Sequence, residues 1–294
     1  LWSLAKEKPV GATPETAAAA RNSAMANRTT IAKLGGVESL VKMFVTGGSE
    51  KSQKNAAGAL SSIASRNPEN RAIIAKRIVN QLNSKVAPDV AARTLTAITR
   101  MCGLMVNPDD SSKEEVQSNQ TTIAKLGGVM ACITWLGNTD DIVQQEAAHA
   151  LLAMSTNNYT TQQLISRAEG LEGLISVIRV GCVPAQEHAA STLWHLCSDE
   201  DSQQRIADAD GIAALVSMLE GSSERGAELA AVTIVRLAQG NSAVSVTVAE
   251  VGGIRPLVRL LDSNSGAAQQ AAATLAELSL VARNRDPIAN AGGI

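Results

Sequence analysis

The sequence predicts an all-α solenoid in which short helical repeats stack side by side. A nine-residue stretch, TTIAKLGGV, occurs at residues 29–37 and again at residues 121–129. Glycines that match the second glycine of this stretch recur with a period of about 42 residues, which is typical of stacked helical repeats. Aromatic residues make up only 2% of the chain, so Ala, Leu, Ile and Val must fill its core.

Each repeat is expected to contain three helices in a fixed order. A short first helix ends at a glycine that permits a sharp bend, with φ above zero if needed. A second helix follows, with apolar residues at i, i+3, i+4 and i+7, as in residues 254–261. After a polar turn, a longer third helix carries paired alanines that let neighbouring helices approach closely, as at Ala189 and Ala190. The alternation typical of strands is missing, which argues against a β-propeller of similar period. The aligned glycines are Gly36, Gly128, Gly170, Gly211, Gly253 and Gly293.

The period divides the chain into complete and partial repeats. Regular repeats are predicted at residues 29–66, 119–157, 158–198, 199–240 and 241–283. Residues 67–118 form a degenerate repeat that lacks the glycines and carries an insertion at 102–118. Residues 1–28 are expected to hold the end of a preceding repeat and an insertion, with a helix at 17–25, and residues 284–294 begin a further repeat. Both insertions precede the identical stretches, which indicates a duplicated block of two repeats. The chain begins without Met and stops after a glycine pair, so we expect it to be part of a longer protein.

Composition argues against several classes of partner. The net charge is −2 and no run of Lys or Arg occurs, so no nucleic-acid partner is expected. No apolar run approaches the roughly 18 residues of a membrane span, so no direct membrane insertion is expected. The four cysteines show no CxxC spacing, which is typical of reduced cysteines in an intracellular protein, either cytoplasmic or nuclear.

The sequence contains no motif for catalysis, a cofactor or a metal. The phosphate-loop, dinucleotide, GxSxG and HExxH patterns are all missing, so we expect no enzyme activity, no cofactor and no small-molecule substrate. His188 and His195 share one predicted helix with Cys182 and Cys197 nearby, but the two histidines lie seven residues apart. That spacing puts them about 10 Å apart along a helix, which is too far for one metal ion.

Three motifs carry a resemblance to a known family. They are Ala-Gly-Gly-Ile at 291–294, Gly-Gly-Ile-x-x-Leu-Val-x-Leu-Leu at 252–261, and Gln-Gln-Ala-Ala-x-x-Leu at 269–275. They resemble the armadillo repeat family, and the likeness extends over six repeats from about Thr29 to Val281. This resemblance implies a right-handed superhelix of three-helix units. It also implies that the third helices line a concave groove for an extended peptide or a partner protein.

The register of the third helices predicts which residues face this groove. Importin-alpha-like arrays carry Trp just after the alanine pair and Asn four residues later. Here the Trp position holds Gly58, Arg93, His149, Ser191, Val232 and Ala273, and the Asn position holds Ser62, Ala97, Ala153, His195, Arg236 and Glu277. One turn earlier lie Lys54, Asp89, Gln145, Glu187, Glu228 and Gln269. The Trp/Asn ladder is therefore missing, and the rows predict a mixed-charge groove for a polar or partly basic peptide.

These patterns favour a protein-binding scaffold or adaptor. An alternative is the substrate-recruiting region of a ubiquitin ligase, with its U-box outside this chain. A nuclear transport receptor is disfavoured because the Trp/Asn ladder is missing. Trp2 and Trp194 are candidates either for groove anchors or for packing between repeats. The Asp109–Glu115 segment is interpreted either as a solvated insertion or as a phosphorylated regulatory loop.

Overall fold

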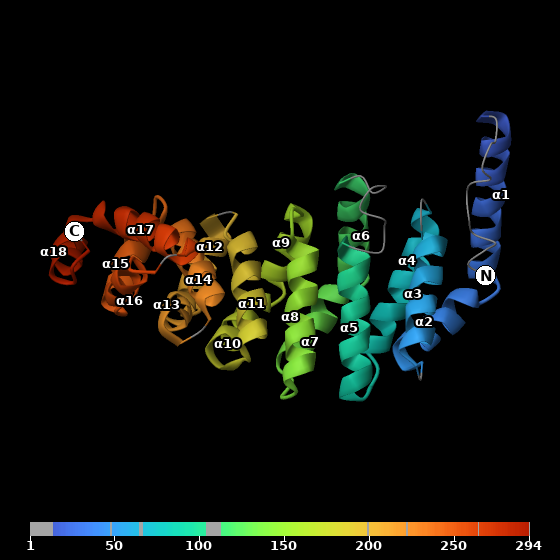
Figure 1. The fold of residues 1–294 in the computed structure, drawn as a ribbon, viewed down its shortest axis with the longest axis horizontal. Coiled ribbons are helices and arrows are strands. Elements are labelled where there is room, and N and C mark those ends of the chain that lie inside the picture. Colours follow the sequence, from blue (N-terminus) through green and yellow to red (C-terminus); the bar gives the residue numbers. More distant parts are fainter. Residues whose placement is uncertain are drawn as a thin grey trace. The chain divides into compact units, whose positions relative to one another are not determined.

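The computed structural model describes residues 14–47, 49–64, 67–103, 113–198, 200–221, 223–263 and 265–293. Within these residues the elements are eighteen α-helices, α1 to α18, and no strand occurs (Figure 1). The all-α prediction is therefore confirmed. The chain divides into two compact units, residues 1–131 and 132–294, which are described separately. None of the described helices is both long and apolar enough to cross a membrane.

The first unit begins with a complete three-helix repeat. Its helices are α1 (Pro14–Lys33), α2 (Gly36–Thr46) and α3 (Glu50–Ala64). The first helix starts at Pro14, so the helix predicted at residues 17–25 is continuous with the first helix of the repeat and crosses the expected boundary at residue 28. The third-helix remnant predicted at residues 1–5 lies outside the described residues.

The degenerate repeat of the first unit contains two helices instead of three. They are α4 (Pro68–Leu82) and α5 (Pro88–Gly103). The expected first and second helices are fused into α4 because Lys76 and Arg77 stand where the other repeats have a bend. Buried residues at helical spacing, including Ile74, Ile78 and Leu82, run along the whole of α4 and hold it as one element.

Part of the predicted insertion at 102–118 is also helical. α6 (Lys113–Lys125) begins inside it, so Lys113, Glu114 and Glu115 belong to the first helix of the next repeat rather than to a loop. The Arg71 guanidinium of α4 forms an ion pair with the Glu115 carboxylate, and both side chains are largely buried. This pair holds α6 against α4. Residues 104–112 lie outside the described part of the chain. α7 (Gly128–Leu136) crosses the boundary between the two units.

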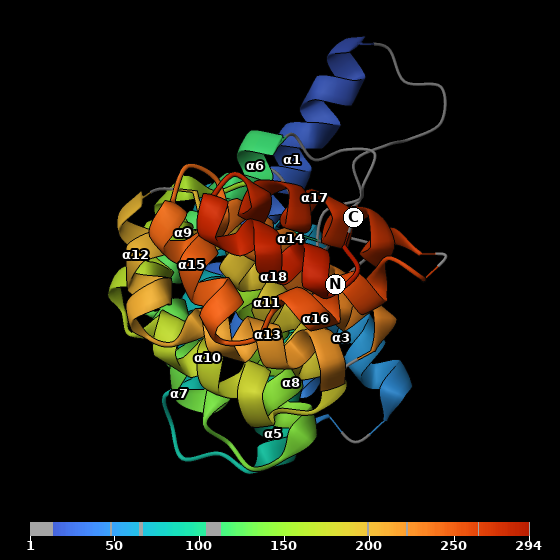
Figure 2. The ribbon, with the colours of Figure 1, turned by 90° about the vertical axis from the view of Figure 1, so that its left-hand side faces the viewer.

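The second unit repeats the predicted three-helix pattern. Its first helices are α9 (Tyr159–Arg167), α12 (Glu200–Asp208), α15 (Ser242–Glu250) and α18 (Ala282–Asn290). Its second helices are α10 (Gly170–Val180), α13 (Gly211–Gly221) and α16 (Ile254–Leu260). Its third helices are α8 (Asp141–Ser155), α11 (Val183–Leu196), α14 (Glu224–Ala238) and α17 (Gly266–Ser279). α8 packs on α11, α11 on α14, and α14 on α17, so the third helices lie side by side (Figures 1 and 2).

Paired alanines allow this close packing. Ala147 and Ala148 of α8 and Ala189 and Ala190 of α11 are all fully buried. Their small side chains bring the helix backbones close together, while Leu, Ile and Met fill the remaining space. The role predicted for the alanine pairs is confirmed.

At the bend between the first and second helices, the aligned residue must lack a side chain, and the residue before it must adopt a positive φ. The aligned glycine lies so close to the preceding helix that a Cβ on Gly36 would stand 2.8 Å from the carbonyl oxygen of Ile31. The positive φ belongs to the residue before it, Gly35, at 79°. In two repeats that preceding residue is not glycine: Glu169 and Asp210 both have φ of 59°. The aligned glycine is therefore required by space, and its neighbour takes the left-handed conformation.

Candidate functional site

The candidate site is the third-helix face, defined here as the three predicted rows of residues on the third helices. In the first unit these rows come from α3 and α5. Lys54 and Gly58 of α3 are exposed, and Ser62 is half-buried, with its hydroxyl donating to the Gly58 carbonyl at 3.0 Å. Lys54 and Gly58 also line a cavity of about 510 Å³ together with Leu40 and Met43 of α2. This part of the face is open to a partner.

The row residues on α5 are engaged with their own unit. Arg93 donates from Nε to the Val45 carbonyl at 2.6 Å and from Nη2 to the Asp89 carboxylate at 2.6 Å. Ala97 is fully buried, so it belongs to the core and cannot contact a partner. The prediction that Ala97 faces the groove is therefore wrong. Of the three row residues on α5, only Asp89 and part of Arg93 remain accessible.

On α8, the central row residue His149 contacts the next third helix. Gln145, His149 and Ala153 are all half-buried. The His149 ring stacks on the His188 ring of α11, with centroids 4.4 Å apart and planes 9° from parallel. Burial and the neighbouring His149 ring lower the pKa of His188 to about 4. The His188 ring is therefore neutral near neutral pH and adds no positive charge to the stack.

Two of the acidic row residues contact the beginning of the following third helix. Glu187 of α11 accepts a hydrogen bond from the hydroxyl of Ser223, the N-cap of α14, and lies 3.7 Å from Nε of Arg225. Glu228 of α14 lies over Gly266, where an added Cβ would stand 2.5 Å from its Oε1. Carboxylates at these positions interact favourably with the positive end of a helix. Glu187 and Glu228 therefore stabilise the packing of the repeats.

A cluster at the end of α11 contains two row residues and a tryptophan. The Arg236 guanidinium of α14 lies over the Trp194 ring, 4.9 Å from its centroid, and Nε donates to the Cys197 carbonyl at 3.1 Å. His195 packs edge-on against Trp194 at a centroid distance of 4.9 Å. Burial lowers the pKa of His195, and the Arg236 charge lowers it further. Trp194 thus packs against Arg236 of the next repeat, as expected for packing between repeats.

The remaining row residues form the open part of the face. Ser191 and Val232 are half-buried at the centres of α11 and α14. On α17, Gln269 and Ala273 are exposed and Glu277 is half-buried. The rows missed two residues that adjoin row residues in the sequence: His188, which contacts the preceding third helix, and Trp194, which contacts the next one. The one sequence signal for these contacts is that each residue lies next to a row residue on a predicted third helix.

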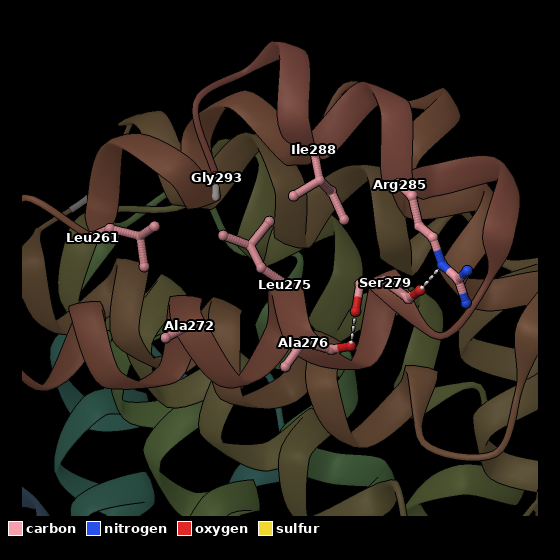
Figure 3. A pocket seen from close by; sticks show the side chains of 8 residues that line it. All are labelled: Leu261, Ala272, Leu275, Ala276, Ser279, Arg285, Ile288 and Gly293. Atoms are coloured by element: carbon pink, nitrogen blue, oxygen red, sulfur yellow. Dashed lines mark hydrogen bonds between the residues drawn. The ribbon is translucent and has the colours of Figure 1, made fainter.

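A cavity of about 430 Å³ lies away from the third-helix face (Figure 3). It is lined by Leu261, Ala272, Leu275, Ala276, Ser279, Arg285, Ile288 and Gly293, none of which is a row residue. The equivalent of Ala272 one repeat earlier is Ala231, which is fully buried and accepts a hydrogen bond from Thr274 of α17 at 3.1 Å. The cavity is therefore the packing face of a third helix rather than a ligand site.

Among the described residues, no group of three or more His, Cys, Asp or Glu side chains could hold a metal ion. The Cys132 thiol is fully buried, and burial raises its pKa to about 12. A thiol with such a pKa stays protonated and unreactive near neutral pH. Cys132 therefore acts as a small apolar core residue.

The comparison with known proteins agrees with this geometry. Residues 25–65, which span most of α1 to α3, match the family model described as Armadillo/beta-catenin-like repeat. No curated protein matches the chain significantly. The chain is similar to the crystal structure of an engineered protein, at 26% identity and a TM-score of 0.66, over 83% of this chain and 97% of that one.

Two designed armadillo repeat proteins share the same fold. One is 18% identical, with a TM-score of 0.64 over 82% of this chain and 99% of that chain. The other, solved in complex with the peptide (KR)4, is 19% identical, with a TM-score of 0.65 over 82% and 99% of the two chains. The chain therefore contains one segment that matches an armadillo repeat, and it shares the fold of designed armadillo repeat proteins.

Proposed function

We propose that the chain is a protein-binding scaffold or adaptor, and that a partner protein or extended peptide binds in a groove lined by the third helices. The observation that carries this proposal is the side-by-side packing of α8, α11, α14 and α17. Their rows present half-buried polar and small side chains, including Gln145, Ser191 and Val232. Such a surface can exclude water from a bound chain and still offer hydrogen-bond partners.

The structural relatives support this proposal. A designed armadillo repeat protein with the same fold was solved with a peptide bound. Armadillo arrays expose a long face made by successive repeats, which suits a partner in extended conformation. Binding through polar contacts is expected because aromatic anchors are few. The proposal includes no catalysis, no cofactor and no nucleic acid, and it places the protein in the cytoplasm or nucleus.

Recognition of a nuclear localisation signal is a poor explanation of the site. In importin-alpha-like arrays a ladder of Trp and Asn side chains would be expected on the third helices. The corresponding Asn positions here hold Ala153, His195, Arg236 and Glu277 in the second unit. None of these residues can both donate and accept hydrogen bonds as an amide side chain does, except a neutral histidine.

Site-specific photocrosslinking tests the proposal. A photoreactive amino acid would be introduced at Ser191 or Val232 on the third-helix face, and at the exposed Arg167 or Arg255 on first and second helices as controls. Cell lysate would then be irradiated with each variant. We expect one set of proteins to crosslink at the third-helix positions and not at the controls. Equal crosslinking at both groups of positions would contradict the proposed face.

A further inference from the structure

Arg236 is held in place by contacts that leave much of its guanidinium available. Its Nε donates to the Cys197 carbonyl at 3.1 Å, and its Cζ lies 4.9 Å from the centroid of the Trp194 ring. These contacts fix the plane of the guanidinium without using either Nη group. Because the side chain is already ordered, a ligand that binds it loses little additional entropy.

The Arg236 charge has no carboxylate partner among the described residues. Seven other arginines of the described chain form ion pairs: Arg71, Arg77, Arg93, Arg179, Arg225, Arg259 and Arg283. Arg236 instead lies at the C-terminal end of α11, where the helix carries about half a negative charge. That partial charge cannot neutralise a whole guanidinium, so a net positive charge remains on the third-helix face.

The acidic row residues of α11 and α14, Glu187 and Glu228, both lie against the next third helix. Glu187 accepts from Ser223 and lies close to Arg225. Glu228 lies over the first turn of α17 at Gly266. Both carboxylates therefore interact with their neighbouring repeat, and the charge they offer to a partner is reduced. Among the row residues of α11 and α14, Arg236 is the one arginine or lysine.

We infer that Arg236 binds the carboxylate of an Asp or Glu side chain in an extended partner segment, with Trp194 as the surface on which the guanidinium rests. This inference rests on the proposed function of the third-helix face. The two unused Nη groups form a planar fork that matches the two oxygens of a carboxylate. A phosphoryl group carries more charge and is typically bound by several arginines, whereas this cluster supplies one. The structure therefore favours a carboxylate over a phosphoryl group.

His195 is suited to take part in the same contact. Its ring packs edge-on against Trp194 at 4.9 Å, beside the Arg236 guanidinium. A neutral imidazole has one N–H group that can donate to a second carboxylate oxygen or to the partner backbone. A bound carboxylate would offset the Arg236 charge and favour the protonated imidazole. Binding is therefore expected to take up protons and to strengthen as the pH falls toward the pKa of the bound state.

The test uses three degenerate nonapeptide libraries that are identical except for a central Glu, Gln or Lys. Binding would be followed by fluorescence anisotropy of labelled peptides, and by Trp194 emission in a variant in which the other tryptophans are replaced by Phe. We expect the Glu library to bind the chain about tenfold more tightly than the Gln library. Arg236→Gln should remove this preference, and Arg236→Lys should keep part of it, because Lys retains the charge but not the fork. Arg255→Gln changes an exposed arginine on the second helix α16, so it is the matched control and should change nothing.

The outcomes separate this inference from the proposed function. Equal binding of the three libraries, lost when Val232 is replaced by a bulkier residue, would support the face and overturn the carboxylate site. Preference for the Lys library would also overturn it. A fourth library with central phosphoserine that binds more tightly than the Glu library would show that the anion is a phosphoryl group, and would contradict the inference. If no library binds at millimolar concentration and photocrosslinking shows no third-helix partner, the inference and the proposed function both fail.

Discussion

His149 and His188 stack face to face across α8 and α11, with ring centroids 4.4 Å apart. Every group that faces His188 is known: His149 of α8, the Gln145 backbone, Glu187 on the same helix and Arg225 of α14. Burial and the His149 and Arg225 charges lower the pKa of His188, while the Gln145 backbone and Glu187 raise it, with a net result of about 4. Protonation of His188 would place a charge in the stack between the two third helices, and the lowered pKa of His188 shows that the folded protein disfavours it.

Stability is expected to decrease as the pH falls from about 6.5 toward 4. The ordinary pKa of His188 is 6.5 and the folded value is about 4, so in this window the unfolded chain binds a proton that the folded chain does not. The loss should be about 1–2 kcal/mol after allowance for partial exposure of the ring. Urea unfolding of wild type and His188→Phe would be compared at about pH 7 and about pH 5. Phe keeps a stacked ring but does not titrate, so an equal pH dependence of both proteins would contradict this assignment.

Replacing the aligned glycine of a bend should destabilise the first unit. In Gly36→Ala the new Cβ would stand 2.8 Å from the Ile31 carbonyl oxygen and 2.7 Å from Ile31 Cγ2. The helices must move apart, at a cost of about 1–3 kcal/mol. Gly58→Ala is the control in the same unit, because an added Cβ there meets nothing within 4 Å and Ala favours a helix. It should raise the free energy of unfolding by about 0.5–1 kcal/mol. A similar loss for both variants would show that space at the bend is not the reason for Gly36.

Where a residue other than glycine has a positive φ, a substitution by glycine should stabilise the protein. Glu169 has φ of 59°, whereas the corresponding Gly35 and Gly127 have φ of 79° and 94°. Glu169→Gly should therefore stabilise the second unit by about 0.5–1 kcal/mol, since it relieves the left-handed strain. Glu169→Ala keeps the strain and should leave stability within a few tenths of a kcal/mol. A gain for Ala as large as that for Gly, measured by thermal unfolding, would contradict the backbone explanation.

The ion pair between Arg71 and Glu115 should matter far more than a neighbouring exposed pair. The side chains of Arg71 and Glu115 are 9% and 17% exposed, whereas those of Arg77 and Glu38 are 51% and 60% exposed. Arg71→Met removes the arginine partner of a largely buried carboxylate and should cost about 2–4 kcal/mol. Arg77→Met, on the same helix α4, should cost less than about 1 kcal/mol. Adding Glu115→Leu to Arg71→Met should recover part of the loss. Equal effects of the two Arg→Met changes on urea unfolding would contradict this ranking.

The fold could be predicted because the repeat period and the residue composition both indicate stacked helices. The recurring glycines, the alanine pairs and the apolar spacing all indicate three-helix repeats, and the structure confirms the all-α architecture. The bend was predicted at the right place, but its positive φ lies one residue earlier than the aligned glycine, as at Gly35. The sequence shows both glycines. It does not show which one lacks room for a side chain and which one adopts a positive φ.

The candidate site was harder to predict because register does not reveal packing between repeats. The rows correctly identify half-buried positions such as His149 and Ser191. They include Ala97, which is fully buried. They also treat Glu187 as available, although it accepts from Ser223 of the next repeat. Such contacts join side chains about forty residues apart, and a single sequence does not reveal which distant residues meet.

Hydrogen exchange of the complex tests the central claim most directly. A partner recovered by crosslinking would be bound to the chain, and amide exchange would be measured along each helix by mass spectrometry. We predict protection of α11 and α14, with no change in α12 and α15, and loss of that protection in a variant with Val232 replaced by a bulkier residue. Protection confined to α12 and α15, with α11 and α14 unchanged, would contradict the account.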